Sequence, residues 1–255
     1  MHLRCACISG LVVLGACNSS GQASTAEAAA AAPAAQASAS PTPAPAVRLD
    51  PGRGKEVGPV FEAWLSPWQE GDEEENTPRS TPAKFRSTTA SQSRAQREAA
   101  GHRAHGMLRF SNDLSRAWVD VRVEGVDLSA VNMFHIHCGR PGILGPILVD
   151  FSLATDLKQN LADGTFSVEL TDEDIVNTAK AGEGLVGVAT MGCTIPSPSL
   201  GSTAPVKTST IAGMAQLARA GELYFNLHTT GQTYFGDLRG QIHAAEAAAG
   251  QERGG

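Results

Sequence analysis

Three histidines in this sequence, His135, His137 and His228, are of a type and spacing that could hold a metal ion. His135 and His137 flank one apolar residue in the run Phe134-His135-Ile136-His137, and alternate residues of a β-strand lie on the same face. The two imidazoles are therefore expected on one face, with Phe134 and Ile136 pointing the other way into a core. Imidazole nitrogens are good ligands for zinc and copper. One interpretation of this pattern is therefore a copper or zinc site.

The same alternation places other polar residues near the histidines. Asn226 shares a strand face with His228, and Asp237 shares one with Arg239. If these strands are neighbours, the side chains form one polar patch with the histidine pair. The alternative is a structural network in which each imidazole bonds to the backbone or to a carboxylate and Arg239 pairs with Asp237. Both interpretations remain open on the sequence alone.

Residues elsewhere give weaker indications of chemistry. His102 and His105 lie in a polar stretch and are expected to be solvated, whereas Trp64 and Trp118 are expected to be core residues. No segment resembles the local signature of a Ser-His-Asp or Cys-His nucleophile. Whether the protein is an enzyme stays open, but the sequence favours one that is not.

Short stretches of alternating apolar and polar residues predict the elements that would position these side chains. The predicted strands are 57–65, 106–110, 117–123, 131–137, 147–151, 164–170, 223–227 and 238–242. Many short strands at even spacing predict an all-β antiparallel sandwich or barrel. A short capped helix or turn is expected over 171–179, with Thr171 as N-cap and Asp174 as the third helical residue. Residues 192–210 are expected to be a loop.

A polar segment interrupts this pattern at residues 69–103. Its composition predicts a long, partly disordered insertion, with a short helix over 91–100. The acidic run at 72–75 lacks the spacing of an EF-hand loop and is expected to be solvated.

Five cysteines are present, and their positions divide them into two groups. Cys5 and Cys7 fall in an N-terminal apolar run and Cys17 ends that run, which leaves Cys138 and Cys193 as a pair. In an oxidising compartment this pair favours a structural disulfide, although a free thiol pair or metal ligands are the alternatives. A loop of that size would stabilise the fold by roughly 4 kcal/mol in the chain-entropy model.

The N-terminus predicts export and lipid anchoring. Residues 1–16 resemble a signal peptide, and Leu14-Gly15-Ala16-Cys17 resembles the lipobox of bacterial lipoproteins, with ordinary signal cleavage as the alternative. Acylated Cys17 would then anchor the protein to a membrane. This predicts a location in the cell envelope, at the outer membrane, in the periplasm or on the cell surface.

The rest of the domain plan follows from composition. Residues 17–46 are rich in Ala, Ser and Pro and are expected to be a disordered linker, residues 47–244 the β-domain, and residues 245–255 a disordered tail. The net charge of -6 is spread without a basic stripe, so nucleic acid is not expected as a partner.

Three segments resemble the CHRD domain, the domain found in chordin. They are Phe134-His135-Ile136-His137-Cys138-Gly139 with the following 145–151, then Glu222 to Thr229, then Gly236 to Ile242. The resemblance covers about residues 57–244, but Tyr234 and Phe235 stand where the family usually has a Pro and a second Gly, and Asp237 replaces a Glu. It implies an immunoglobulin-like sandwich or barrel of largely unassigned function and brings no catalytic residues. The His-Ile-His run is also weakly similar to the metal-binding strand of Cu,Zn superoxide dismutase, another β-sandwich.

Two functions are expected from these observations. The first is a non-catalytic binding or structural module of the cell envelope, with an unknown protein or small-molecule ligand. The alternative is a metal-binding β-sandwich that uses His135, His137 and His228 to hold copper or zinc and that could be redox-active. A hydrolase is disfavoured because a nucleophile motif was not found.

Overall fold

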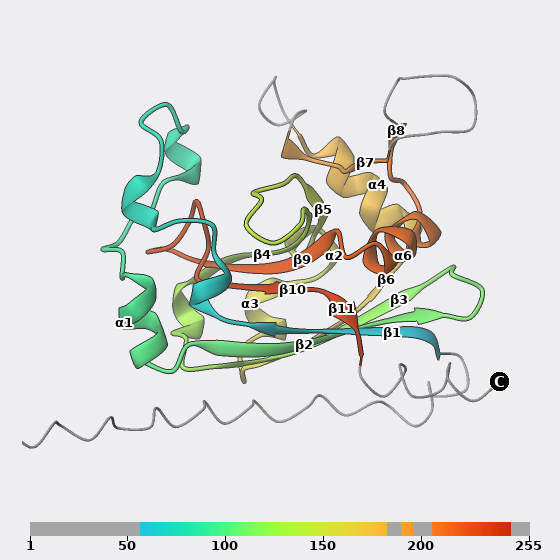
Figure 1. Ribbon diagram of the computed structural model, residues 1–255, viewed down its shortest axis with the longest axis horizontal. Helices are drawn as coiled ribbons and strands as arrows, with labels where there is room; N and C mark the ends of the chain where they lie inside the picture. The colour runs from blue at the N-terminus through green and yellow to red at the C-terminus, as the bar shows by residue number, and fades with distance from the viewer. Residues whose placement is uncertain (1–56, 183–189, 196–205, 246–255) are drawn as a thin grey trace, which may run out of the picture. The chain divides into compact units, whose positions relative to one another are not determined.

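The alternating segments fold into two antiparallel sheets that pack face to face (Figure 1). The computed structural model describes residues 57–182, 190–195 and 206–245, and the structural statements that follow concern these residues. The first sheet has the strand order β11-β1-β2-β3-β6. Its strands are β1 (Val57–Leu65), β2 (Arg103–Ser111), β3 (Ala117–Glu124), β6 (Thr165–Leu170) and β11 (His243–Ala244).

The second sheet has the strand order β10-β9-β4-β5. Its strands are β4 (Val131–Cys138), β5 (Ile147–Asp150), β9 (Leu223–Thr229) and β10 (Leu238–Gln241). A separate pair joins β7 (Thr194–Ile195) to β8 (Val206–Lys207). The predicted all-β antiparallel sandwich is therefore confirmed.

The core lies between the two sheets. On β4 and β9 the inward side chains Phe134, Ile136, Phe225 and Leu227 are completely buried, and burial of side chains of this size contributes about 1.5–3 kcal/mol each. The sheets approach closely at Gly106 of β2, where a Cβ atom would lie 2.9 Å from the ring of Phe225. This burial leaves the alternate residues of β4 and β9 on the opposite face of the second sheet.

One edge of the sandwich is closed by backbone hydrogen bonds. The amide of Ser66, just after β1, donates to the carbonyl of Arg239 at 2.9 Å, and the amide of Arg239 donates back to the Ser66 carbonyl at 3.3 Å. The first sheet therefore continues into β10, and the sandwich has the character of a partly closed barrel.

The helices lie on the loops and edges. They are η4 (Leu128–Ala130), α2 (Phe151–Ala154), α3 (Leu157–Asn160), α4 (Asp172–Lys180) and α6 (Ile211–Arg219). The capping box that the sequence predicts at the start of α4, between Thr171 and Asp174, is present. Helix α6 was not predicted, although its apolar residues follow a helical period. The expected loop at 192–210 contains β7 and β8.

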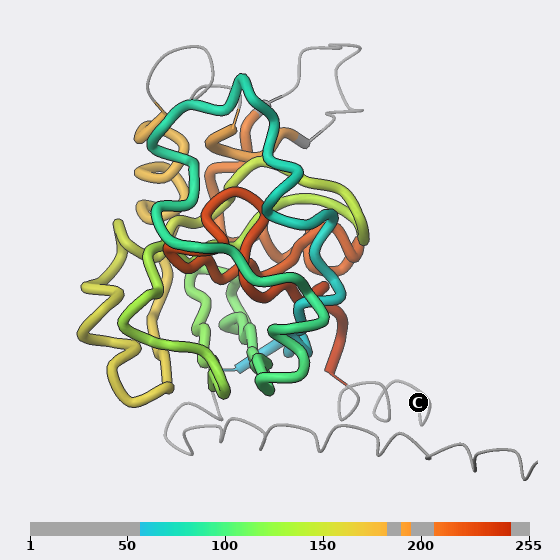
Figure 2. Tube along the Cα trace, turned by 90° about the vertical axis from the view of Figure 1, so that its left-hand side faces the viewer, coloured from blue at the N-terminus to red at the C-terminus, as the bar shows by residue number. Residues whose placement is uncertain are grey.

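Residues 69–103 are folded where the sequence predicted partial disorder. They contain the rest of η1 (Pro67–Gln69), then η2 (Glu74–Asn76), η3 (Ala83–Phe85) and α1 (Arg94–Ala99). In Figure 2 this segment passes in front of the sandwich and around the loop between β9 and β10. The composition predicted disorder because it does not reveal that several polar groups of the segment, such as Glu74 and Arg97, bond to that loop.

The buried carboxylate of Glu74 makes the clearest of these contacts. It accepts hydrogen bonds from the backbone amides of Thr233 (3.2 Å), Tyr234 (2.9 Å) and Phe235 (3.0 Å), and from the hydroxyl of Ser87 (2.7 Å). One side chain of the acidic run thus holds three consecutive amides of the β9–β10 loop. Glu74 is therefore a structural residue and not part of a solvated loop.

Three single-residue predictions are also wrong. His105 is 1% exposed, because it lies within β2 with its Nε2 atom 3.0 Å from Glu62. His102 places its Nδ1 atom 2.6 Å from the carboxylate of Asp237, so it too is not simply solvated. Trp64 is 38% exposed and stacks on the His105 ring instead of entering the core, whereas Trp118 is buried as expected.

Candidate metal centre

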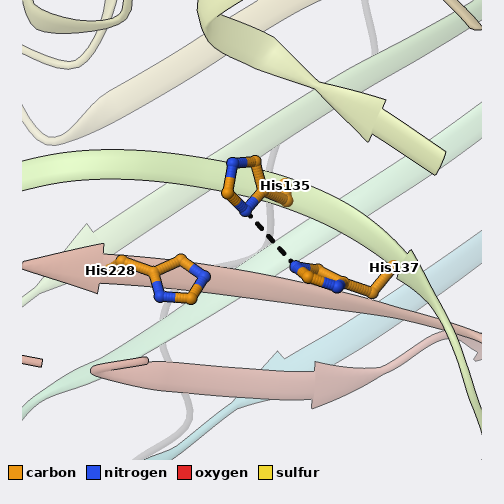
Figure 3. A group of neighbouring side chains, drawn as sticks. All are labelled: His135, His137 and His228. Carbon is orange, nitrogen blue, oxygen red and sulfur yellow. Dashed lines mark hydrogen bonds between the residues drawn. The ribbon is translucent and has the colours of Figure 1, made fainter. Parts of the chain in front are cut away.

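Strands β4 and β9 bring His135, His137 and His228 together on the face of the second sheet that points away from the core (Figure 3). In the register of this pair, His135 lies opposite Asn226, and His228 lies opposite Met133. The ring centroids are 5.2 Å apart for His135 and His137, 5.1 Å for His135 and His228, and 6.2 Å for His137 and His228. One nitrogen from each ring lies within 4.8 Å of the other two.

Each ring also uses its second nitrogen to contact a fixed oxygen. The Nδ1 atom of His137 lies 2.8 Å from the carbonyl of Gly145, and that of His228 lies 3.1 Å from the carbonyl of Thr233. A carbonyl oxygen only accepts, so both Nδ1 atoms carry the proton and both Nε2 atoms carry a lone pair. The Nε2 atom of His135 lies 3.8 Å from the carboxylate of Asp150. Histidines that ligate metals are typically oriented by such outer partners.

Two of the three inward nitrogens are hydrogen-bonded to each other, and the third has no partner among the described residues. His137 Nε2 and His135 Nδ1 face each other at 3.3 Å, and His228 Nε2 is buried without a hydrogen-bond partner among the described residues. A structural network would also pair His228 Nε2, because a buried polar atom without a partner costs about 1–3 kcal/mol. The arrangement instead leaves His228 Nε2 unpaired beside the hydrogen-bonded nitrogens of His135 and His137.

The spacing of the inward nitrogens fits a single ion for one pair of histidines, and the third must move closer. Metal–nitrogen bonds of about 2.0–2.1 Å place tetrahedral ligand atoms about 3.3–3.4 Å apart, which matches the 3.3 Å between His135 and His137. Three ligands of one ion can all be at most about 3.6 Å apart at those bond lengths, when they lie in one plane with the ion. Nitrogens that are now up to 4.8 Å apart would therefore have to approach by as much as about 1.2–1.5 Å.

Burial keeps all three imidazoles neutral. It lowers the pKa of His137 to about 3, although the Gly145 carbonyl partly opposes the effect. It lowers the pKa of His228 to about 4. Burial, followed by the neighbouring His228 and His137, also holds the pKa of His135 well below its ordinary value. The neutral imidazole is the form that binds metal.

A cavity of about 340 Å³ opens above the histidines. Its walls come from β4, the segment after it, the 69–103 segment and the β9–β10 loop. Its lining includes Phe85, Leu144, Ile147 and Tyr234, with the methionines Met133 and Met191. Leu144 at its edge is 45% exposed, so the site has an apolar wall and a solvent-facing rim.

The predicted polar patch forms only in part. Asn226 lies on the same face and donates to the Phe235 carbonyl at 2.8 Å. Arg239 stacks on Tyr224 at 3.5 Å, and Tyr224 in turn stacks on His137 with ring centroids 5.0 Å apart. Arg239 is therefore one ring away from the histidines.

Asp237 does not join this patch as predicted. Its carboxylate contacts His102 and accepts from the Thr229 hydroxyl at 3.1 Å, beside a second, polar cavity of about 220 Å³. The pairing between Asp237 and Arg239 that the structural interpretation expected is not formed among the described contacts.

Sequence reasoning missed several residues that support the histidines. The carbonyls of Gly145 and Thr233 are backbone groups, which residue type does not reveal. Tyr224 could have been found, because it shares the alternation of β9 with Asn226 and His228. Met133 could have been found in the same way, two residues before His135.

The predicted disulfide between Cys138 and Cys193 is confirmed, with a Cα–Cα distance of 6.0 Å. Cys138 directly follows His137, and Cys193 lies two residues after Met191. The disulfide therefore joins two walls of the cavity.

The predicted anchor and linker lie outside the described residues. This applies to the signal peptide at 1–16, to Cys17 and to the linker that follows it. In the part of the chain that is described, no helix is long and apolar enough to cross a membrane.

Comparison with known families finds that the sequence model of the CHRD domain matches residues 85–242. This range runs from η3 to the end of β10 and includes all three histidines and both disulfide cysteines. No curated protein and no solved structure matches the chain.

Proposed function

Because the chain belongs to the CHRD domain family, we propose that it is a non-catalytic binding module and that its ligand is a metal ion held by His135, His137 and His228. The family supports a binding or structural role and not a particular ligand. The metal follows from the site itself. The inward nitrogens of three neutral, buried imidazoles face one centre, and this single observation carries the proposal.

The chemistry of the site favours binding over catalysis. A tetrahedral ion held by three histidines keeps one open position, and here that position faces the apolar cavity. Among the described residues that line the cavity there is no Cys, Asp or Glu, and Ser80 is not a hydrogen-bond partner of the three histidines. The proposal is therefore an ion-binding module and not a hydrolase.

The proposed location is the cell envelope, with the domain held on a membrane through acylated Cys17. Support for it comes from the lipobox-like Leu14-Gly15-Ala16-Cys17 and from the disulfide, because such bonds persist in oxidising compartments. The Ala/Pro-rich linker after Cys17 would hold the domain away from the membrane surface.

The proposal is tested by titrating metal-free protein, prepared without a polyhistidine tag, with Zn²⁺ in a calorimeter. We expect one ion per chain. The variant His228→Asn keeps a donor for the Thr233 carbonyl but removes the inward nitrogen, so its affinity should fall by about 100-fold or more, beyond the 10–100-fold cost of losing an outer partner. His243→Asn is the matched control, because His243 is exposed on β11, and it should bind as the wild type does.

Two results would overturn the proposal. One is the absence of stoichiometric binding of any transition metal to correctly folded protein. The other is equal affinity in the wild type and in His228→Asn. A protein that binds no metal, and whose His228→Asn variant merely unfolds at a lower temperature, would make the histidines structural.

A further inference from the structure

The geometry points to monovalent copper, Cu(I), as the ion that this site selects, with a methionine thioether from the cavity wall as its fourth ligand. This inference rests on the proposed function, since it names the ion for the same three histidines. It depends on two features that the histidines themselves do not determine: the methionines and the charge of the cavity wall.

Methionine is concentrated at this cavity. Of the four methionines in the described chain, Met107, Met133, Met191 and Met214, two line the cavity over the histidines. Met133 lies on the same strand face as His135 and directly opposite His228 in the β4–β9 register. Its side chain is therefore placed next to the ligands by the pleat of the sheet.

Met191 reaches the cavity from a different segment, which is fixed in place. The Gly192 amide, next in the chain, donates to the carbonyl of Ile147 on β5 at 2.7 Å. Two residues after Met191, Cys193 is joined to Cys138, the residue that follows His137. The disulfide thus holds a thioether and a histidine ligand on facing walls of one cavity.

The cavity wall offers no negative charge to offset a divalent ion. Among the described residues that line it there is no Asp, Glu, Lys or Arg. The carboxylates near the site lie outside the lining: that of Asp150 is 3.8 Å from the outer nitrogen of His135. That of Glu74, whose charge acts on His228, is held by backbone amides of the β9–β10 loop. A buried charge is costly without a compensating partner, and the cost rises with the charge. Three neutral imidazoles in an apolar wall therefore suit a +1 ion better than a +2 ion.

Ligand softness leads to the same ion. Thioethers are soft ligands that select Cu(I), whereas Zn²⁺ is satisfied by nitrogen, thiolate and carboxylate or water ligands. If water were the fourth ligand beside the three histidines, the metal affinity of the site would not depend on the methionines. The two assignments thus differ in a property that mutation can measure.

The test compares Cu(I) and Zn²⁺ affinities in the methionine variants. Metal-free protein without a tag is titrated with Cu(I) under anaerobic conditions against a chromophoric Cu(I) chelator, and separately with Zn²⁺ against a zinc dye. The double variant Met133→Leu/Met191→Leu should lose at least about tenfold in Cu(I) affinity, because it lacks the soft ligand, while its Zn²⁺ affinity changes by less than about threefold. Met107→Leu, on the other sheet, is the matched control and should change neither affinity.

X-ray absorption of the Cu(I) form gives an independent result. We expect a sulfur scatterer in the copper shell of the wild type and its loss in the double variant. Unchanged Cu(I) affinity in the double variant, or a copper shell of nitrogen alone in the wild type, overturns the assignment to Cu(I).

Failure of this inference is distinguishable from failure of the proposed function. If the wild type binds Zn²⁺ or Cu(I) through the histidines but its Cu(I) affinity does not depend on the methionines, the metal site stands and the copper assignment is wrong. If the wild type binds neither ion, both are wrong.

Discussion

The buried neutral histidines should make the metal-free protein unstable in mild acid. In the unfolded chain each histidine has a pKa of about 6.5. In the folded protein burial lowers the pKa of His137 to about 3 and that of His228 to about 4, and holds the pKa of His135 well below its ordinary value. Between these values the unfolded state binds more protons than the folded state. The contribution of these histidines to the free energy of unfolding is therefore fully present above about pH 6.5, and it decreases as the pH falls toward their pKa values in the folded protein.

The size of the effect follows from the number of histidines. One proton taken up on unfolding changes the free energy by about 1.4 kcal/mol per pH unit. Integrated from pH 7 to pH 5, His137 and His228 each remove about 2 kcal/mol, so the two together remove about 4 kcal/mol, and His135 acts in the same direction. A typical domain has a free energy of unfolding of about 5–15 kcal/mol, so a large part of it should be lost by pH 5.

The assay is urea unfolding between pH 7 and pH 5 in the presence of a chelator. The carboxylates with lowered pKa values, such as Asp113 at about 2, titrate below this window, whereas burial raises the pKa of Glu70 well above its ordinary value, so this group opposes part of the loss as the pH falls. His228→Asn should reduce the loss by about 2 kcal/mol, whereas His243→Asn, at an exposed position on β11, should leave the loss unchanged. A stability that is flat across the window, or a loss that is identical in His228→Asn, would refute the account of a neutral buried cluster.

Three further predictions concern other parts of the molecule. Cys193→Ser should lower the free energy of unfolding by about 2–5 kcal/mol, measured by chemical denaturation, and thiol labelling of the native wild type should detect neither Cys138 nor Cys193. Glu74→Ala should cost about 3 kcal/mol or more, because several buried donors lose their acceptor. It should also weaken metal binding about 10–100-fold through the Thr233 carbonyl, whereas the exposed neighbour variant Glu75→Ala should change neither quantity. Cys17→Ser should move the protein from the membrane fraction to the soluble fraction, and an unacylated mature N-terminus other than Cys17 in the wild type would contradict the anchor.

The strands could be predicted from the sequence because the alternation of apolar and polar residues is visible within each short segment. Phe134, Ile136, Phe225 and Leu227 alternate with polar residues, and the core requires that alternation wherever one face of a sheet is buried. The same period predicted that His135, His137 and His228 share a face, and the antiparallel register of β4 and β9 brings them together.

Long-range contacts could not be predicted in this way. The 69–103 segment has the composition of a disordered loop, yet the carboxylate of Glu74 accepts hydrogen bonds from three amides of a loop about 160 residues later in the chain. The ring of His102 likewise contacts the carboxylate of Asp237, which lies far away in the sequence. A polar residue has the same local pattern whether it meets water or a distant backbone group, so composition alone cannot separate the two.

The central claim, that one metal ion lies between the three histidines, is tested most directly by anomalous diffraction from crystals of the metal-loaded protein. With data collected on both sides of the absorption edge of the metal, the account predicts one anomalous peak about 2.0–2.1 Å from His135 Nδ1, His137 Nε2 and His228 Nε2. Their outer nitrogens should remain on the Asp150 carboxylate and on the carbonyls of Gly145 and Thr233. A metal-loaded crystal with its peak elsewhere, or with these three nitrogens still turned toward an empty centre, would contradict the account.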